Sequence, residues 1–109
     1  MKKRCLPCEG GVKPLQRKQA LRLMKWLKDW KMSAKGRAIY KDYRMKDFMS
    51  AIRFINRIAK LAEAENHHPD LSLTNYRRLT VTLSTHAIGG LSENDFILAV
   101  KIDRITPKQ

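Results

Sequence analysis

The chain has 109 residues, of which 43% are hydrophobic and 30% are charged, and its formal net charge is +13. This length predicts one domain, residues 1–109, whose core can form without disulfides or a structural metal. Charges interrupt every apolar stretch well short of the ~20 residues of a membrane span, and no apolar run follows the basic N-terminus. We therefore expect a cytoplasmic protein with no membrane span and no signal peptide.

The positive charge is concentrated in the first part of the chain. Residues 1–46 contain 15 Lys and Arg against 3 Asp and Glu, whereas residues 47–109 contain 8 against 7. Such a surface favours encounters with polyanions, so an acidic protein or a nucleic acid is a candidate partner of this half.

Residues 1–13 lack periodicity and include Cys5 and Cys8, which predicts an irregular N-terminal arm. In a reducing compartment both cysteines would stay thiols. One Cys-x-x-Cys pair supplies only half of a four-ligand zinc site, so chance or a packing turn is favoured over a metal or redox site.

Residues 14–28 predict a helix that begins at Pro14, because apolar and basic residues recur on opposite faces. We interpret it as a helix docked on the core, although membrane-surface and partner-binding helices share this pattern. Residues 30–33 and 37–43 then predict two strands of a hairpin around Lys35-Gly36. The predicted apolar face of the helix comprises Ala20, Leu21, Met24 and Leu27.

The most regular helical pattern follows Asp47, which we predict to be the N-cap. Apolar residues recur with the 3.6-residue period over about five turns, and Asn66 and Pro69 mark the end of the helix. The predicted apolar face comprises Phe48, Ala51, Ile52, Ile55, Ile58, Ala59 and Ala62.

Beyond Pro69 the apolar residues alternate with a period of two. Residues 71–76 and 79–86 predict adjacent antiparallel strands, with His86 at the end of the second strand's polar face. Gly89-Gly90 breaks this run, and Ser92 can cap a last helix in which Asp95 occupies the third position. The predicted order is therefore α-β-β-α-β-β-α.

All three histidines lie between Glu63 and Asp95. Glu63 and His67 are four residues apart and share one helix face, while His68 follows at the corner before the next strand. If the strands pack against the long helix, His86 approaches both imidazoles and a cavity with groups titrating near neutral pH results. Each residue also has a structural explanation, as a solvated helix charge, a helix C-terminal residue or a capping-box acid.

Four features stand in an order that resembles the signature of the pterin-4a-carbinolamine dehydratase family. They are EAENHHP at residues 63–69, Tyr76, TVTLSTH at residues 80–86 and GLSEND at residues 90–95. The resemblance covers about Pro14 to Ile105 and implies an α+β fold, a four-stranded antiparallel sheet with three helices on one face, in homodimers or homotetramers. The chain departs from the family after His-His-Pro, where Leu71 replaces a frequent aromatic residue.

The activity that the resemblance implies is dehydration of a 4a-hydroxytetrahydropterin to quinonoid dihydropterin, in tetrahydropterin recycling and without a metal or organic cofactor. By resemblance His67, His68 and His86 are catalytic, with His68 and His86 as proton-transfer groups and His67 as the third member. Glu63 would orient an imidazole or a ring nitrogen, and Asp95 would support the site or cap its helix.

Two other functions use the same residues differently. The family also includes a binding protein that stabilises the dimer of a homeodomain transcription factor in animals, so a non-catalytic binding or regulatory protein is the alternative. Retention of all three histidines favours catalysis. A metal site built from the histidines fits the residue types but not the family.

Overall fold

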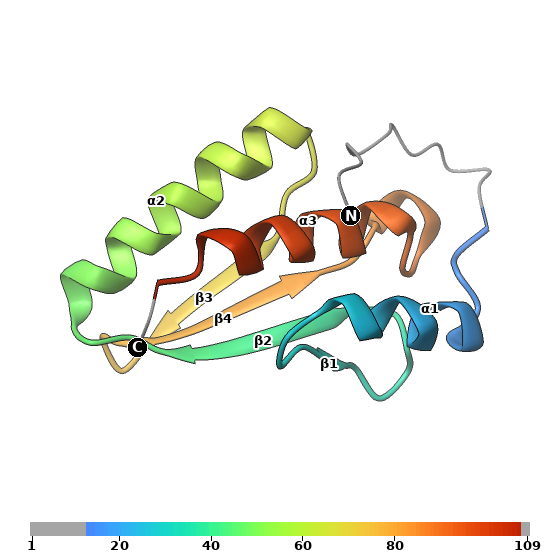
Figure 1. Cartoon of the computed structure of the whole chain (residues 1–109), viewed down its shortest axis with the longest axis horizontal. Helices are drawn as coiled ribbons and strands as arrows, with labels where there is room; N and C mark the ends of the chain where they lie inside the picture. Colours follow the sequence, from blue (N-terminus) through green and yellow to red (C-terminus); the bar gives the residue numbers. More distant parts are fainter. Residues whose placement is uncertain (1–12, 108–109) are drawn as a thin grey trace.

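Four antiparallel strands and three α-helices make up residues 13–107, the part of the chain that the computed structural model describes. The sheet has the strand order β1-β2-β4-β3, and the helices lie over one of its faces (Figure 1). This confirms the predicted α+β fold and element order. The predicted N-terminal arm falls, except for Lys13, outside the described residues, as do Cys5 and Cys8. The elements, with η for a 3-10 helix, are α1 (Arg17–Leu23), η1 (Met24–Trp26), β1 (Lys31–Met32), β2 (Ile39–Arg44), α2 (Phe48–Glu65), β3 (Asp70–Thr74), β4 (Arg78–Leu83), η2 (His86–Ile88) and α3 (Glu93–Ile105).

The sheet has one face in the core and one polar face. In β4 the side chains of Leu79, Val81 and Leu83 are fully buried. The register places them opposite Tyr43, Lys41 and Ile39 of β2, so these residues point toward the helices. The alternate positions of both strands, 40, 42, 44, 78, 80 and 82, are partly or fully exposed. The period-two pattern of the sequence therefore predicts the two faces of β4 correctly.

The caps of α2 match their prediction. The Asp47 carboxylate accepts a hydrogen bond from the Ser50 backbone N–H (2.7 Å), which also holds the pKa of Asp47 below its usual value. At the other end, Asn66 adopts the left-handed conformation (φ 51°) and turns the chain away from the helix axis.

The buried face of α2 is rotated relative to its prediction. Phe54 is 1% exposed although the prediction omitted it, whereas Phe48 is 49% exposed. Apolar residues occur around much of α2, so several stripes satisfy the helical period and only tertiary packing selects one of them. The buried residues are Ala51, Phe54, Ile58, Ala62 and Glu65.

The first helix is shorter than predicted. α1 begins three residues after Pro14, because the Leu15 backbone N–H donates to the Leu91 carbonyl (2.8 Å) and the chain before α1 pairs with the segment before α3. A 3-10 turn then ends the helical segment at Trp26. Leu21 is 52% exposed, so its assignment to the apolar face was wrong; Ala20 is the fully buried residue of α1.

The hairpin of β1 and β2 is present, but both strands differ from their predicted bounds. The Ser33 hydroxyl accepts hydrogen bonds from the backbone N–H groups of Arg37 (3.2 Å) and Ala38 (3.1 Å). Gly36, which lies between Ser33 and Arg37 in the sequence, has a φ of 67°, a conformation that favours glycine. These contacts fold residues 33–38 into the connection, so β2 begins at Ile39.

The second pair of strands also ends earlier than the alternation predicts. Asn75 and Tyr76 both have left-handed φ angles (46° and 53°), so Tyr76 belongs to the turn and β3 ends before it. After β4, Thr85 pairs with Gly90 and closes a loop that contains η2. His86 therefore begins η2 rather than lying on the polar face of a strand, which corrects that prediction.

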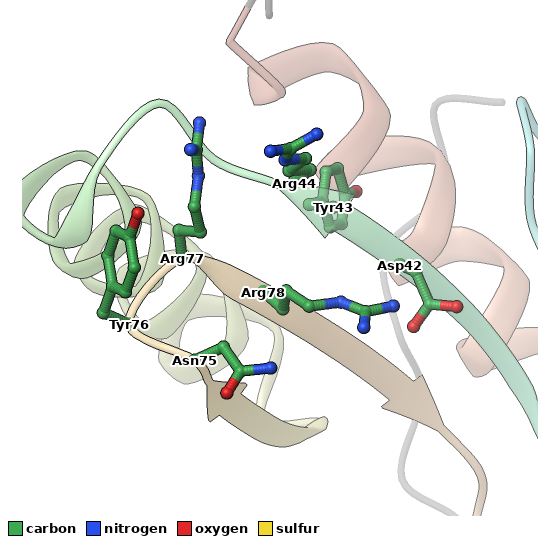
Figure 2. A pocket seen from close by; sticks show the side chains of 7 residues that line it. All are labelled: Asp42, Tyr43, Arg44, Asn75, Tyr76, Arg77 and Arg78. Atoms are coloured by element: carbon green, nitrogen blue, oxygen red, sulfur yellow. The ribbon is translucent and has the colours of Figure 1, made fainter.

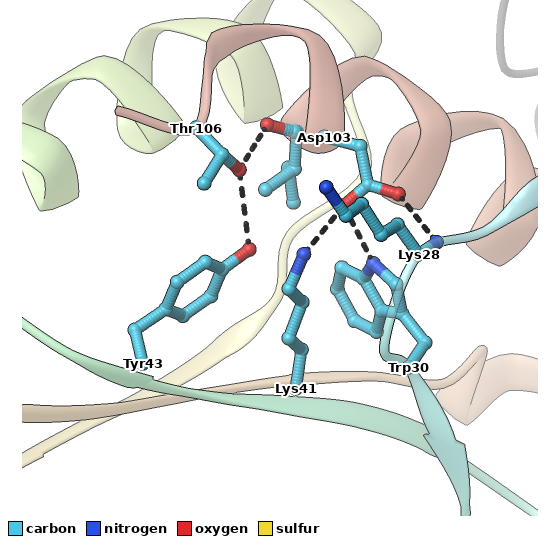
Figure 3. A network of polar contacts seen from close by, with 7 residues as sticks. Lys28, Trp30, Lys41, Tyr43, Asp103 and Thr106 are labelled. Carbon is cyan, nitrogen blue, oxygen red and sulfur yellow. Dashed lines mark hydrogen bonds and ion pairs between the residues drawn. The ribbon is translucent and has the colours of Figure 1, made fainter. Parts of the chain in front are cut away.

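Asp103 connects α3 to β2 and to the segment that precedes β1 (Figure 3). Its carboxylate accepts hydrogen bonds from the Lys28 backbone N–H (3.1 Å), Trp30 Nε1 (2.9 Å) and Lys41 Nζ (3.1 Å). Lys41 lies on the core face of β2, and this ion pair offsets the free-energy cost of removing its ammonium group from water. Within residues 13–107, no helix is both long and apolar enough to cross a membrane.

Candidate functional site

His67 lies where the chain leaves α2 and turns toward the start of α3. Its Nε2 atom is 2.7 Å from Asp95 Oδ1. The His67 side chain is 11% exposed and that of Asp95 is fully buried, so the contact is largely shielded from water. The left-handed Asn66 makes this contact possible, because it ends the helix and redirects the next residue.

Asp95 joins segments that are distant in the sequence. Its second oxygen, Oδ2, accepts hydrogen bonds from Thr85 Oγ1 (2.9 Å) and from the Ser92 backbone N–H (3.0 Å). The Thr85 and Ser92 hydroxyls are also 2.7 Å apart. Ser92 and Asp95 form the predicted capping box, so Asp95 both caps α3 and contacts a histidine.

His68 contacts the other acidic residue of the cluster. Its Nε2 is 2.5 Å from Glu63 Oε2, and the two side chains are 57% and 75% exposed. The four-residue spacing predicted that Glu63 and His67 share a helix face. The structure instead pairs Glu63 with His68, because α2 ends before His67 and the chain changes direction there. Because both side chains are exposed to water, this pair contributes little stability.

His86 is exposed on η2, immediately after Thr85. No hydrogen bond joins its side chain to His67 or His68 within the residues that the structure describes. Its segment is nevertheless held near the other two, because Thr85 and His67 contact the two oxygens of the same carboxylate. The structure thus brings together the segments of all three histidines, and it makes direct imidazole contacts with carboxylates for two of them.

Thr85 is a polar residue of this network that the sequence reasoning did not single out. It is 4% exposed and contacts both Asp95 and Ser92 through its hydroxyl. Its position immediately before His86 in the sequence is the feature that could have identified it. Among residues 13–107, no group of three or more His, Cys, Asp or Glu side chains is arranged to hold a metal ion.

A pocket of about 550 Å³ lies away from the histidines (Figure 2). It is found at the Arg78 end of β4, whereas His86 follows the Leu83 end of the same strand. The sequence analysis did not identify this pocket. Its lining residues are Asp42, Tyr43, Arg44, Asn75, Tyr76, Arg77 and Arg78.

Known proteins match nearly the whole described segment. Residues 13–105 match the family model described as pterin 4 alpha carbinolamine dehydratase. A relative from Halorhodospira halophila, named "Putative pterin-4-alpha-carbinolamine dehydratase", is 44% identical over 103 residues, which cover 94% of each chain. A relative from Rickettsia bellii with the same name is 49% identical over 102 residues, covering 93% of this chain and 88% of the relative.

Two solved structures resemble this one. The transcriptional coactivator/pterin dehydratase from Brucella melitensis has a TM-score of 0.80 and 30% identity, covering 87% of this chain and 100% of its own. A pterin dehydratase-like protein, identified as a RuBisCO assembly factor in the alpha-carboxysome, has a TM-score of 0.62 at 18% identity, covering 77% and 96%. The second likeness concerns the fold alone.

Proposed function

The chain belongs to the pterin 4 alpha carbinolamine dehydratase family, and we propose that it dehydrates a 4a-hydroxytetrahydropterin to quinonoid dihydropterin and water in tetrahydropterin recycling. The observation that carries this proposal is the meeting of three motif segments at one buried carboxylate. His67, Thr85 beside His86, and the start of α3 all contact Asp95.

The reaction requires two proton movements that imidazoles can perform. The C4a–O bond breaks with its electron pair going to oxygen, the leaving oxygen gains a proton, and a ring nitrogen of the pterin loses one. We assign these transfers to His68 and His86, whose exposed side chains can reach a bound substrate. Positioned acids and bases of this kind each contribute about 10²–10⁴-fold to the rate near neutral pH.

His67 is the third member of the proposed site, and the carboxylates act as positioning residues. When His67 Nε2–H donates to Asp95, Nδ1 remains free to accept a hydrogen bond from the substrate. Glu63 orients the imidazole of His68 through their short contact. The chain's own residues thus supply the acid, the base and their orientation, and the proposed reaction requires no metal or organic cofactor.

The decisive experiment measures dehydration of the 4a-carbinolamine by ultraviolet absorbance in a coupled hydroxylase assay. We expect His68→Ala and His86→Ala each to lower the rate at least ~100-fold, as loss of general acid–base catalysis would. Lys60→Ala, which changes an exposed residue of α2, serves as the control. If the folded wild-type protein does not accelerate the reaction over buffer, the proposal is wrong.

Asp95→Asn tests the positioning role in the same assay. We expect a lower kcat with a smaller change in KM, because the amide no longer selects the tautomer of His67 whose Nε2–H donates and whose Nδ1 accepts. A purely structural role for Asp95 would lower thermal stability and leave the kcat of the folded protein unchanged.

The location, oligomeric state and partners of the protein are part of the same proposal. We propose a cytoplasmic homodimer or homotetramer, in line with the exposed apolar side chains of Phe48 and Met49 on α2. An acidic protein or a nucleic acid remains the candidate second partner of the basic N-terminal half. A non-catalytic binding role is the alternative function, and wild-type dehydration that is lost in both histidine variants would exclude it as the sole function.

A further inference from the structure

The pocket of about 550 Å³ at the turn between β3 and β4 is lined mainly by basic and polar side chains (Figure 2). We propose that it binds a nucleoside phosphate, with Arg44 and Arg78 holding the phosphate and Tyr76 stacking on the base. Its volume lies in the range of about 300–1,000 Å³ typical of small-molecule sites. This site is separate from the histidine cluster and does not depend on the proposed dehydration.

The positive charge of the pocket favours an anionic ligand. Arg44 and Arg78 are direct partners in the β2–β4 register, so two exposed arginine side chains leave the polar face of the sheet from adjacent positions. Their guanidinium groups point apart, that of Arg78 toward Asp42 (Figure 2). Like charges at directly opposite positions destabilise a sheet. Neither arginine forms an ion pair with another residue in the range 13–107. An external anion bound by both side chains would offset this repulsion, and the planar guanidinium fork matches the oxygens of a phosphate.

The single acidic residue of the lining cannot neutralise all three of its arginines. Asp42 is the acidic residue of the lining, and its Oδ1 already accepts a hydrogen bond from Thr80 Oγ1 (2.6 Å). Arg77 adds a third guanidinium and is anchored by donation from its Nε to the Met45 carbonyl (2.7 Å). The lining therefore carries three positive charges against one negative charge.

The turn places an exposed aromatic ring at the edge of the pocket. Asn75 and Tyr76 are consecutive residues in the left-handed region, and such a conformation is strained for a bulky side chain. The Tyr76 ring is 59% exposed, and the Arg77 guanidinium lies 5.9 Å from its centroid. Strained residues cluster at ligand-binding sites, and an exposed ring beside a guanidinium is a platform for stacking a flat base.

The ligand chemistry is thus a phosphate joined to an aromatic base. A free mononucleotide and a nucleotide unit within a single strand both present it, so the experiment must separate these two sources. Calorimetric titration at low salt would compare inorganic phosphate, adenosine, adenosine 5′-monophosphate and a single-stranded adenine octanucleotide. We expect the monophosphate to bind at least tenfold more tightly than phosphate or adenosine alone. A much higher affinity per site for the octanucleotide would identify the strand as the source, and comparable affinity would identify the free nucleotide.

Matched variants test the assigned residues. Arg44→Gln/Arg78→Gln and Tyr76→Asn should each weaken monophosphate binding at least tenfold, and asparagine at position 76 tolerates the left-handed backbone. Arg22→Gln is the control, since it removes an exposed arginine from α1, which lies over the start of β2 and away from its Arg44 end (Figure 1). Circular dichroism verifies folding.

Three results would overturn the proposal. They are equal binding of phosphate and monophosphate, an unchanged affinity in the double arginine variant, and equally tight binding of an aspartate-rich peptide. Carbinolamine dehydration should be the same in these variants as in the wild type, so failure of the nucleotide site and failure of the dehydratase proposal are separately visible.

Discussion

Asp95 shows how one residue can cap a helix and contact a histidine of the proposed site. Its side chain is fully buried, and its two oxygens meet an imidazole, a hydroxyl and a backbone N–H. A buried carboxylate is tolerated only when such partners replace its hydration. The capping explanation and the site explanation, which the sequence left as alternatives, therefore describe the same side chain.

The contacts of Glu63, His67 and His68 differ from those that their spacing in the sequence suggests. The positions of His67 and His68 depend on where α2 ends, because one residue more or less of helix rotates each side chain by about 100°. The left-handed Asn66 sets that end, and it moves the Glu63 contact from His67 to His68. Spacing rules assume a continuous helix and cannot anticipate this change.

Tyr43 provides a prediction at the scale of one residue. Burial raises the pKa of its hydroxyl from 10.0 to about 12, the hydrogen bond with Thr106 opposes the shift, and the negative charge of Asp103 adds to it. Because the folded state holds the proton more tightly, this contribution to stability is complete below pH 10.0 and is lost as the pH rises through about 12.

Alkaline titration of tyrosinate absorbance measures this shift. We expect a component near pH 12 in the wild type that is missing from Tyr43→Phe, and urea unfolding should show the wild type losing stability relative to the variant above pH 10.0. Loss of a component that titrates at pH 10 instead would show that the Tyr43 hydroxyl is not shielded from water.

At the scale of elements, α2 was predictable and α1 was not. α2 carries its own signals, an N-cap at Asp47 and a left-handed cap at Asn66, and both act locally. The start of α1 is instead set by the contact of Leu15 with Leu91, which is far away in the sequence. Likewise, the pocket beside Tyr76 requires the β2–β4 register, which the predicted hairpins leave undetermined.

The attachment of α3 to β2 gives a prediction at this scale. Asp103→Ala should destabilise the protein by about 3 kcal/mol, because Lys41 would keep a buried ammonium group without its partner. Lys41→Met should cost much less, since the apolar side chain fits the core face of β2. We expect the double variant to be at least ~1 kcal/mol more stable than Asp103→Ala alone.

Urea unfolding of the four proteins completes this double-mutant cycle. The double variant still lacks the acceptor for Trp30 Nε1 and the Lys28 backbone, so it should not regain the stability of the wild type. Strict additivity of the two single substitutions would mean that the Lys41–Asp103 contact contributes nothing to holding the two elements together.

At the scale of the whole molecule, the fold separates a sheet face covered by helices from an exposed polar face. The helices cover one face of the sheet, and the other face remains polar, with Arg44 and Arg78 among its exposed residues (Figure 1). The sequence could predict the charge excess of the first half but not where it gathers. Arg44 belongs to that half and Arg78 does not, and only the pairing of β2 with β4 places them side by side.

The net charge of +13 predicts how the protein responds to salt. Mutual repulsion of like charges is stronger in the folded chain than in the expanded one, and raising ionic strength from 0.01 M to 0.15 M shortens the screening length from about 30 Å to about 8 Å. Thermal unfolding in sodium chloride should therefore show a Tm that rises across this range by several degrees, equivalent to about 1 kcal/mol for a domain of this size. A Tm that falls would show instead that attractive ion pairs dominate the surface.

Sodium phosphate at matched ionic strength should raise the Tm further in the wild type than in Arg44→Gln/Arg78→Gln, because an anion bound by the two arginines stabilises the folded state beyond general screening.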